Sequence, residues 1–222
     1  MVLQAVFLGT NPAGEKVYKW LNQRSDVEVV ALLTEREQLS LITELRPDLV
    51  ISSGFRHKVP EKVLETPDKG VVNLHPSFLP YNRGAHPYIW PLVEDTPAGV
   101  SIHYMDSGLD EGPVIDRREV EVRPEDTARS LYDRLQEEQF RQFRENWEEI
   151  KNGAEAREQD LKRGETHLPE DLDEVCSIDL DREVRMEEAI DRLRALSFDS
   201  RKLAYFEKNG EKYYIRIQIE KD

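Results

Sequence analysis

The chain has 222 residues, 38% hydrophobic and 34% charged, which suits one substantial domain with an appendage or two small ones. No apolar run is long enough to cross a membrane, and residues 2–8 predict a strand and not a signal peptide. The net charge of −14 disfavours nucleic acid as a partner, because binding it requires clustered lysine and arginine side chains. Cys176 is the only cysteine, so we expect no internal disulfide and a cytoplasmic location.

The first third of the chain alternates strand and helix patterns. Short apolar runs bounded by turn residues predict four strands, at residues 2–8, 27–33, 48–52 and 70–74. Apolar residues at helical spacing predict the helices between them, at residues 15–23, 38–45 and 59–65. Repeated β-α-β units predict an α/β fold with a parallel, doubly wound sheet, whose ligands gather at the carboxyl ends of the strands.

The pattern changes after residue 98. Apolar and polar residues alternate over 99–104, which predicts a half-buried strand, and 114–122 predicts another. An apolar stripe between residues 131 and 150 predicts a long helix that ends at Gly153. We therefore expect the first unit of the chain to comprise residues 1–153.

Residues 154–222 form the second predicted unit. Residues 154–177 are polar and charged, which predicts a surface loop or a wrapping arm. A short helix is expected at 186–196, with three residues facing inward, Ala189, Ile190 and Leu193. The dipeptide Asn209-Gly210 predicts a terminal β-hairpin. The hairpin and the apolar stripe of the long helix indicate a homodimer.

Two polar runs carry the chemistry. Asn73 and His75 lie at the end of the fourth predicted strand, and Asp110 lies in a glycine-rich run that follows residue 99. An amide can donate to a developing oxyanion, a histidine can take a proton, and a carboxylate can orient that histidine. The three side chains are therefore expected to converge around one carbon and to catalyse acyl transfer to an amine.

The two runs resemble the motifs of formyltransferases that use N10-formyltetrahydrofolate. Residues 73–84 match Asn-x-His-x-Ser-x-Leu-Pro-x-x-(Arg/Lys)-Gly, and residues 99–112 are similar to Gly-(Val/Cys)-Thr-x-His followed by Asp-x-Gly. The resemblance covers about two thirds of the chain. It implies a Rossmann-like catalytic domain over residues 1–153 with a small helix and hairpin appendage, N10-formyltetrahydrofolate as co-substrate, and three catalytic residues, Asn73, His75 and Asp110.

Within that family, residues 81–87 and 56–60 look most like the sugar N-formyltransferases, which formylate nucleotide-linked amino sugars for surface polysaccharides. The acidic chain has no room for the basic domain with which methionyl-tRNA formyltransferases bind tRNA. Two alternatives stay open. The chain could formylate another amine, on methionyl-tRNA or on a small metabolite, or it could be a non-catalytic binding protein on the same fold.

The resemblance also implies which residues bind the two substrates. The folate is expected to contact six residues, Arg56, His57, Lys58, Val59, Asp106 and Gly108. The nucleotide sugar is expected to contact eight, Gly9, Thr10, Ser77, Tyr81, Asn82, Arg83, Gly84 and His86. The basic run 56–58 is either a solvated loop or an attractant for the acidic folate tail.

Two of these assignments are ambiguous from the residues alone. Arg83 and Gly84 either position a substrate phosphate or hold their loop through backbone contacts. His103 is expected to be structural. No cluster of histidine, cysteine or acidic residues has the spacing of metal ligands.

Overall fold

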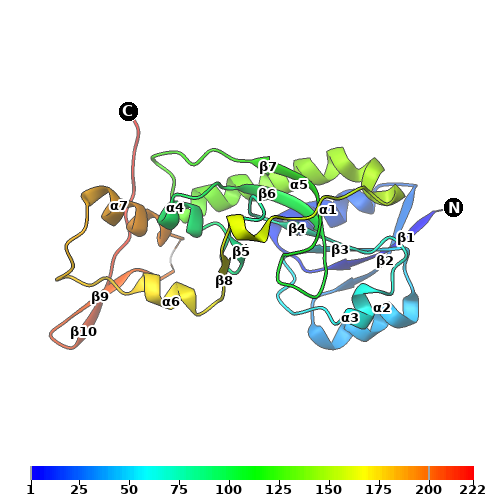
Figure 1. Cartoon of the computed structure of the whole chain (residues 1–222), viewed down its shortest axis with the longest axis horizontal. Helices are drawn as coiled ribbons and strands as arrows, with labels where there is room; N and C mark the ends of the chain where they lie inside the picture. The colour runs from blue at the N-terminus through cyan, green and yellow to red at the C-terminus, as the bar shows by residue number, and fades with distance from the viewer. Residues whose placement is uncertain (1, 200) are drawn as a thin grey trace.

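The computed structural model describes residues 2–199 and 201–222, and a six-stranded sheet of order β2-β1-β3-β4-β6-β7 forms its centre. The strands are β1 Leu3–Leu8, β2 Val27–Leu33, β3 Leu49–Ser53, β4 Val71–His75, β6 Gly99–Tyr104 and β7 Val114–Glu119. The first four pair in parallel, whereas β6 and β7 run antiparallel to their neighbours. The predicted α/β class with a mostly parallel sheet is confirmed (Figure 1).

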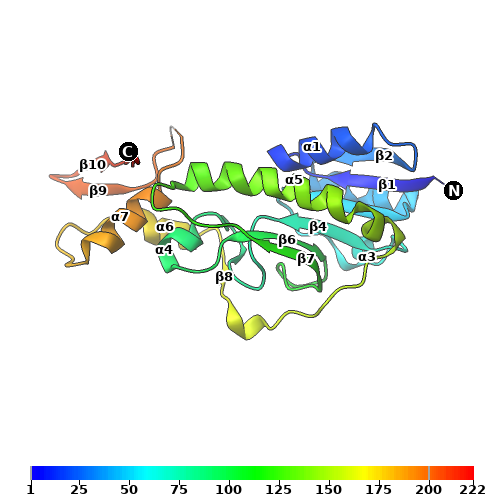
Figure 2. The same ribbon diagram turned by 90° about the horizontal axis from the view of Figure 1, so that it is seen from above.

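Helices cover both faces of this sheet. The helices α1 (Pro12–Leu21) and α5 (Ala128–Asn152) lie on one face, as Figure 2 shows, and share an apolar core with Phe7 and Ile51. On the other face, α2 (Ser40–Leu45) follows the 3-10 turn η1 (Arg36–Leu39), and α3 (Glu61–Leu64) follows β3. Two buried faces are typical of a parallel sheet with crossover helices.

Local sequence explains where the long helix α5 begins and ends. The Thr127 hydroxyl caps its first turn by accepting from the Ser130 backbone N–H. Gly153 ends the helix in the left-handed conformation, with φ of +86°, as predicted. In the part of the chain that the structure describes, no helix combines the length and apolarity needed to cross a bilayer.

The strand β6 was predicted to be half-buried, and this was wrong. Its residues from Gly99 to His103 are all buried. The apolar side chains of Val100 and Ile102 join the core, as expected. The polar ones are covered too, because the Ser101 hydroxyl bonds the backbone of Ser77 and Leu79. Loop residues after β4 therefore cover the face of β6 that the alternating sequence pattern predicted to be exposed to solvent.

The C-terminal part contains α6 (Asp171–Cys176), α7 (Met186–Ala195) and the hairpin of β9 (Tyr205–Lys208) and β10 (Glu211–Tyr214). Asn209 and Gly210 both have positive φ, which is the turn predicted for this hairpin. Ala189 and Leu193 are half-buried, but Ile190 is 41% exposed, so the prediction that it faces inward was wrong. The helix α7 contacts α4 (Trp90–Glu94), which joins the two parts of the chain.

The predicted polar arm is an ordered connection. It contains the 3-10 turn η2 (Leu161–Arg163) and the short strand β8 (Thr166–His167). β8 pairs in parallel with β5 (Arg83–Gly84), which belongs to the polar run over residues 73–84 that begins in β4. The arm therefore passes from the end of α5 back across the edge of the sheet where the candidate site lies (Figure 2).

Candidate active site

Two neighbouring strands carry one half of the site. Asn73 and His75 are alternate residues of β4, so their side chains point to the same side of the sheet. β6 pairs His103 directly opposite Asn73. The amide nitrogen Nδ2 of Asn73 lies 3.1 Å from Nε2 of His103. The register of the strands thus brings one amide and two imidazoles together, and all three residues are buried.

A loop supplies the carboxylate. Asp110 follows β6 and has a positive φ of +55°. Its Oδ2 lies 3.4 Å from His75 Nδ1 and accepts a hydrogen bond of 3.0 Å from the backbone N–H of Gly84. Its Oδ1 lies 3.4 Å from Asn73 Nδ2 and 3.5 Å from His103 Nε2. The predicted convergence of Asn73, His75 and Asp110 is confirmed; we call these residues with His103 the polar cluster.

The surroundings set the charges of the cluster. Burial lowers the pKa of His75 below its ordinary value of 6.5, His103 lowers it further, and the Asp110 carboxylate only partly opposes them. Burial alone would raise the pKa of Asp110, but His75, His103 and the Gly84 N–H outweigh it and hold that pKa below its ordinary range. Near pH 7 the cluster therefore pairs a neutral imidazole with an ionised carboxylate.

Hydrogen-bond partners assign the ring protons. His103 Nδ1 lies 2.9 Å from the carbonyl oxygen of Tyr104, to which only an N–H can donate. When Nδ1 alone carries the proton, Nε2 can accept from the Asn73 amide. For His75, Nδ1 lies 3.4 Å from Asp110 Oδ2 and Nε2 lies 3.5 Å from the carbonyl oxygen of Asn82, so an N–H on either nitrogen would face an oxygen. A proton on Nδ1, directed to the Asp110 carboxylate, would leave the lone pair of Nε2 to accept a proton.

His103 is the member of the cluster that sequence reasoning missed. Its position on the polar side of a strand predicted a structural role. Two signals could have identified it: His103 is the histidine of the run 99–103 that resembles the family motif, and the register of β4 and β6 sets it opposite Asn73. That register depends on which strands are neighbours, and the sequence of one strand does not contain this information.

The residues expected to bind folate lie on two loops beside the cluster. β3 pairs with β4, so the loop that begins after Ser53 starts next to the catalytic strand. In this loop Val59 is buried against the cluster of apolar residues that includes Met105, while the basic run 56–58 is exposed. Asp106 accepts from the Gly108 N–H at 2.8 Å and so shapes the second loop. Exposed cations and loop backbone are the groups that an acidic pteridine cofactor could use.

The residues expected to bind the nucleotide sugar divide into exposed and internal ones. Thr10 is exposed, and Tyr81 and His86 are half-buried. Gly9 is buried with φ of +84°, and a Cβ there would lie 2.5 Å from the Ser53 carbonyl oxygen. The missing side chain lets the loop after β1 approach β3, and a contact of Gly9 with the nucleotide sugar stays a prediction. Ser77 is 1% exposed, and its hydroxyl has no hydrogen-bond partner among the described residues.

Asn82 and Arg83 turn their side chains into the protein. The Asn82 amide exchanges two hydrogen bonds with the Thr96 hydroxyl. The Arg83 guanidinium donates to the Pro80 carbonyl oxygen at 3.0 Å and to the Thr166 hydroxyl at 2.9 Å, and the residue is only 6% exposed. The guanidinium therefore holds the loop in this structure, and a contact of Arg83 with a substrate phosphate stays a prediction. The Gly84 N–H also serves within the protein, by bonding Asp110.

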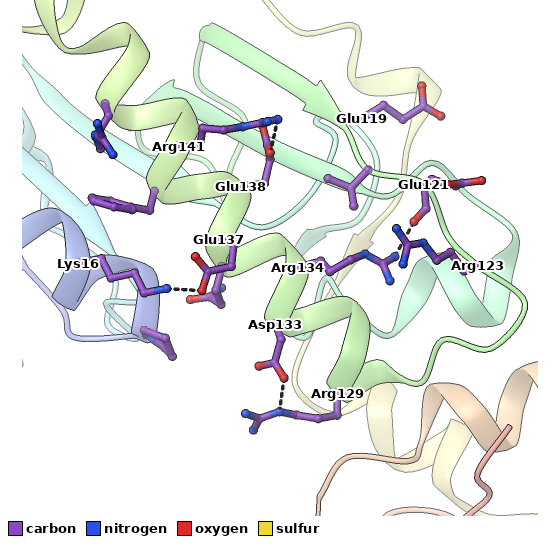
Figure 3. Close-up of a pocket in the computed structure, with 15 residues that line it drawn as sticks. Lys16, Glu119, Glu121, Arg123, Arg129, Asp133, Arg134, Glu137, Glu138 and Arg141 are labelled. Carbon is purple, nitrogen blue, oxygen red and sulfur yellow. Dashed lines mark hydrogen bonds and ion pairs between the residues drawn. The ribbon is translucent and has the colours of Figure 1, made fainter. Parts of the chain in front are cut away.

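A separate groove of about 960 Å³ runs along α5, between the start of α1 and the strand β7 (Figure 3). No member of the polar cluster lines it. Many of its charges are paired with neighbours, as in Lys16–Glu137 and Arg129–Asp133. We assign this groove no part in the chemistry, because the groups that could react with a formyl donor lie elsewhere.

Comparison with known proteins places the chain. The model of the formyl transferase family matches residues 15–145. The chain belongs to this family. The stretch of this formyltransferase that the model matches contains the whole polar cluster. A second model, for the dimerization C-terminal domain of N-formyltransferases, matches residues 171–221.

Named relatives point in the same direction. This formyltransferase is 32% identical over 187 residues to the dTDP-4-amino-4,6-dideoxyglucose formyltransferase of Mycobacterium tuberculosis. The aligned region covers 83% of this chain and 78% of the relative. It is 40% identical over 100 residues to the methionyl-tRNA formyltransferase of Geobacter metallireducens. That aligned region covers 45% of this chain and 32% of the relative. The second likeness is confined to about half of the chain, whereas the first extends over most of both proteins.

Solved structures resemble the full fold. A 4-N formyltransferase from Francisella tularensis superposes with a TM-score of 0.89 at 26% identity and covers 99% of both chains. A formyltransferase from Anoxybacillus kamchatkensis, solved with UDP-4,6-dideoxy-4-formamido-L-AltNAc and tetrahydrofolate, has a TM-score of 0.69 at 34% identity. It covers 77% of this chain and 88% of its own. The predicted formyltransferase fold, with its C-terminal hairpin, is confirmed.

Proposed function

We propose that this enzyme transfers the formyl group of N10-formyltetrahydrofolate to the amine of a nucleotide-linked amino sugar. The observation that carries the proposal is the convergence of Asn73, His75 and Asp110, in which burial lowers the pKa of His75 and the Asp110 carboxylate lies 3.4 Å from its ring. The Mycobacterium tuberculosis relative is named for a dTDP-linked 4-amino sugar, so a sugar of that class is the first substrate to test.

The reaction needs one base and one oxyanion donor. The sugar amine attacks the formyl carbon, a carbon–nitrogen bond forms, and the formyl oxygen becomes negative. His75 takes the amine proton at Nε2, a step that contributes about 10²–10⁴ in rate. The bond from carbon to N10 of the folate then breaks, His75 returns the proton to that nitrogen, and tetrahydrofolate leaves with the formamide formed.

Asn73 is proposed as the donor to the oxyanion. In the resting structure its amide hydrogens are directed to His103 and Asp110. The 3.4 Å contact with Asp110 is long, so it is the one that a negative oxygen would replace. A donor of this kind stabilises a tetrahedral transition state by about 2.7–4 kcal/mol.

Asp110 is proposed to stabilise the protonated form of His75. Once Nε2 carries a proton, the imidazolium lies between the Asp110 carboxylate at Nδ1 and the Asn82 carbonyl oxygen, 3.5 Å from Nε2. Both oxygens are buried with it, and in such surroundings charge pairs are stronger than in water. The pair therefore lowers the barrier for proton transfer without a covalent intermediate.

The folate is proposed to lie across the two loops at the end of β3 and after β6. Arg56, His57 and Lys58 are exposed there, Val59 contributes an apolar wall, and Asp106 with Gly108 forms the opposite turn. The protein has a net charge of −14, which repels the acidic glutamate tail of folate. Exposed cations at this loop would attract that tail locally. Thr10, Tyr81 and His86 remain as exposed or half-buried contacts for the nucleotide sugar.

Direct assay decides between this function and its alternatives. The protein is incubated with N10-formyltetrahydrofolate and, in parallel, dTDP-linked 4-amino sugars, the corresponding sugars without an amine, free amines and methionyl-tRNA. Mass spectrometry should show a gain of one formyl group on the amino sugar alone, and His75→Ala should abolish it. Formylation of tRNA or of free amines in place of every nucleotide sugar would overturn the proposal, and no formylation at all would favour a binding protein.

We also propose that the enzyme is a homodimer that joins through the C-terminal part, which we separate from the catalytic domain at residue 153. The region matched by the dimerization model exposes apolar side chains, among them Leu180, Val184, Met186, Tyr213 and Tyr214. Light scattering should give a mass near twice that of one chain. Met186→Glu with Tyr214→Glu should yield monomers that keep their fold, because both side chains are exposed.

We place the reaction in the cytoplasm, in the supply of sugars for surface polysaccharides. The acidic surface and the absence of paired cysteines fit that setting. Deletion of the gene should remove the N-formyl sugar from the cell surface. A surface composition that stays unchanged would argue against this role.

A further inference from the structure

The connection between the two matched regions holds the catalytic loop. We call residues 154–167 the strap; they lie outside both stretches that the family models match, 15–145 and 171–221. Figure 2 shows the strap leaving the end of α5 and returning past β6 and β7 to β8. Its path takes it along the loop that carries Asp110, and one of its side chains bonds that loop directly.

Gln159 is that side chain. Its Nε2 donates one hydrogen bond of 2.9 Å to the carbonyl oxygen of Asp110 and a second of 2.7 Å to that of Gly112. Both amide hydrogens are thus used on the turn that sets the direction of the Asp110 carboxylate. Asp110 itself has a positive φ, which L residues rarely adopt without such support.

The orientation of the Gln159 amide is fixed by these two carbonyl groups. If its oxygen and nitrogen exchanged places, Oε1 would face two other carbonyl oxygens and be repelled. In the observed orientation Oε1 is buried and has no hydrogen-bond partner among the described residues. An unsatisfied buried acceptor is unfavourable. Glutamine carries this cost at position 159, and what it contributes in return is the two N–H donors, which an apolar residue lacks.

The rest of the strap is anchored on both sides of Gln159. Before it, Arg157 and Val114 exchange two backbone hydrogen bonds of 2.8 Å. After it, Gly164 lies against the backbone of Pro80, where a Cβ would approach the carbonyl oxygen to 2.3 Å. Gln159 is therefore held by strap contacts that do not involve Asp110, and the turn depends on it for position.

We propose that Gln159 is a positioning residue for formyl transfer, which holds Asp110 against His75 from outside the catalytic domain. The inference rests on the proposed function for its kinetic readout only. Its physical content is a contact between the strap and the Asp110–His75 pair. The charged and titratable groups that face His75 are Asp110 and His103, so the state of His75 reports directly on where Asp110 lies.

The test compares Gln159→Met, which keeps the length and loses both donors, with Glu158→Met on the neighbouring exposed residue. We expect Gln159→Met to lower kcat about 10- to 100-fold, the range for misplacement of a reacting group, while KM for the nucleotide sugar stays within about twofold. Glu158→Met should match the wild type. In Gln159→Met the NMR titration of the His75 ring should move to lower pH, because the loop over residues 76–84 still buries the ring while its carboxylate partner is displaced.

A kcat within about twofold of wild type together with an unchanged His75 titration would overturn the proposal. An equal loss in Glu158→Met would overturn it too, since the effect would then belong to the strap in general. If Gln159→Met fails to fold, Gln159→Asn keeps the amide but cannot reach both carbonyl groups, and the same two outcomes apply. The titration needs no substrate, so a wild-type protein that formylates nothing would end the proposed function while leaving this inference open to the same test.

Discussion

The two halves of the site are held in place by different means. Asn73, His75 and His103 lie on β4 and β6, where backbone ladders on both sides and a buried core fix them. Asp110 lies on a loop, and side-chain and backbone contacts from distant parts of the chain, at Gly84 and Gln159, hold it. Strand positions are rigid because many residues share the constraint, whereas a loop position can be lost with a single contact.

This difference separates the expected effects of mutation. Changes on the strands remove a chemical group from a scaffold that stays in place. Changes around the loop leave every reacting group present but alter the distance between them. The first kind should lower kcat, and loss of His75 should also remove the acid limb of the pH profile, whereas the second kind should shift that limb.

The largest effect is expected from His75→Ala. Loss of the base should reduce kcat about 10²–10⁴-fold while KM for the nucleotide sugar changes little, because the amine is still held by other groups. Single-turnover and steady-state assays with the amino sugar measure both parameters. Lys62→Ala is the control, since Lys62 is exposed on α3 and has no proposed role, so it should leave kcat near wild type. Near-normal turnover in His75→Ala would remove the mechanism.

Asn73→Ala should rank next. The loss of one oxyanion donor is expected to lower kcat about 10²–10³-fold. Asn73→Asp keeps the shape but replaces the donor with a negative charge beside Asp110, and should be at least as inactive. A thermal melt checks the fold, because Asn73 also bonds His103 at 3.1 Å. Activity in Asn73→Asp equal to wild type would show that the formyl oxygen is stabilised elsewhere.

Asp110→Asn tests the loop half through its pH dependence. An asparagine can still accept from the Gly84 N–H, so we expect the turn to persist and kcat to fall by about 10²-fold. In the wild type, kcat/KM should fall with decreasing pH as His75 becomes protonated, and burial puts that fall below pH 6.5.

The sign of the change in this variant follows from the charges that face His75. Asp110 raises the pKa of His75, whereas burial and His103 lower it. Removal of the carboxylate should therefore lower that pKa, and the acid limb of the profile should move to lower pH. An acid limb that stays in place, or moves to higher pH, would show that the Asp110 carboxylate does not raise the pKa of His75.

The contrast between strands and loop also explains what could be predicted from the sequence. Hydrophobic runs and turn residues located β1 to β4, because each of these signals lies within a few consecutive residues. The motif resemblance identified Asn73, His75 and Asp110 in the same way. His103 required knowledge of which strand pairs with β4, and Gln159 required the path of the strap. The motif at residues 99–103 contains His103 but does not show that it faces Asn73, and the polarity of residues 154–177 predicted only that they lie at the surface.

The smallest effect is expected at Arg83, and it separates two roles that the sequence left open. Its guanidinium donates hydrogen bonds to Pro80 in the loop after β4 and to Thr166 in the strap, and so joins these two segments. Arg83→Lys keeps the charge but cannot make both contacts, so the free energy of unfolding should fall by about 1–3 kcal/mol. KM for the nucleotide sugar should stay within about twofold. Urea denaturation and steady-state kinetics measure the two quantities.

Arg157→Lys provides the control for this last variant, because Arg157 is exposed and bonds Val114 through its backbone alone. It should change neither stability nor KM. If Arg83→Lys instead raised KM about tenfold with unchanged stability, the guanidinium would have to reach the substrate phosphate. The loop after β4 would then have to open before catalysis. The contact between Arg83 and the strap at Thr166 would exist only in the absence of substrate, and substrate binding would break it.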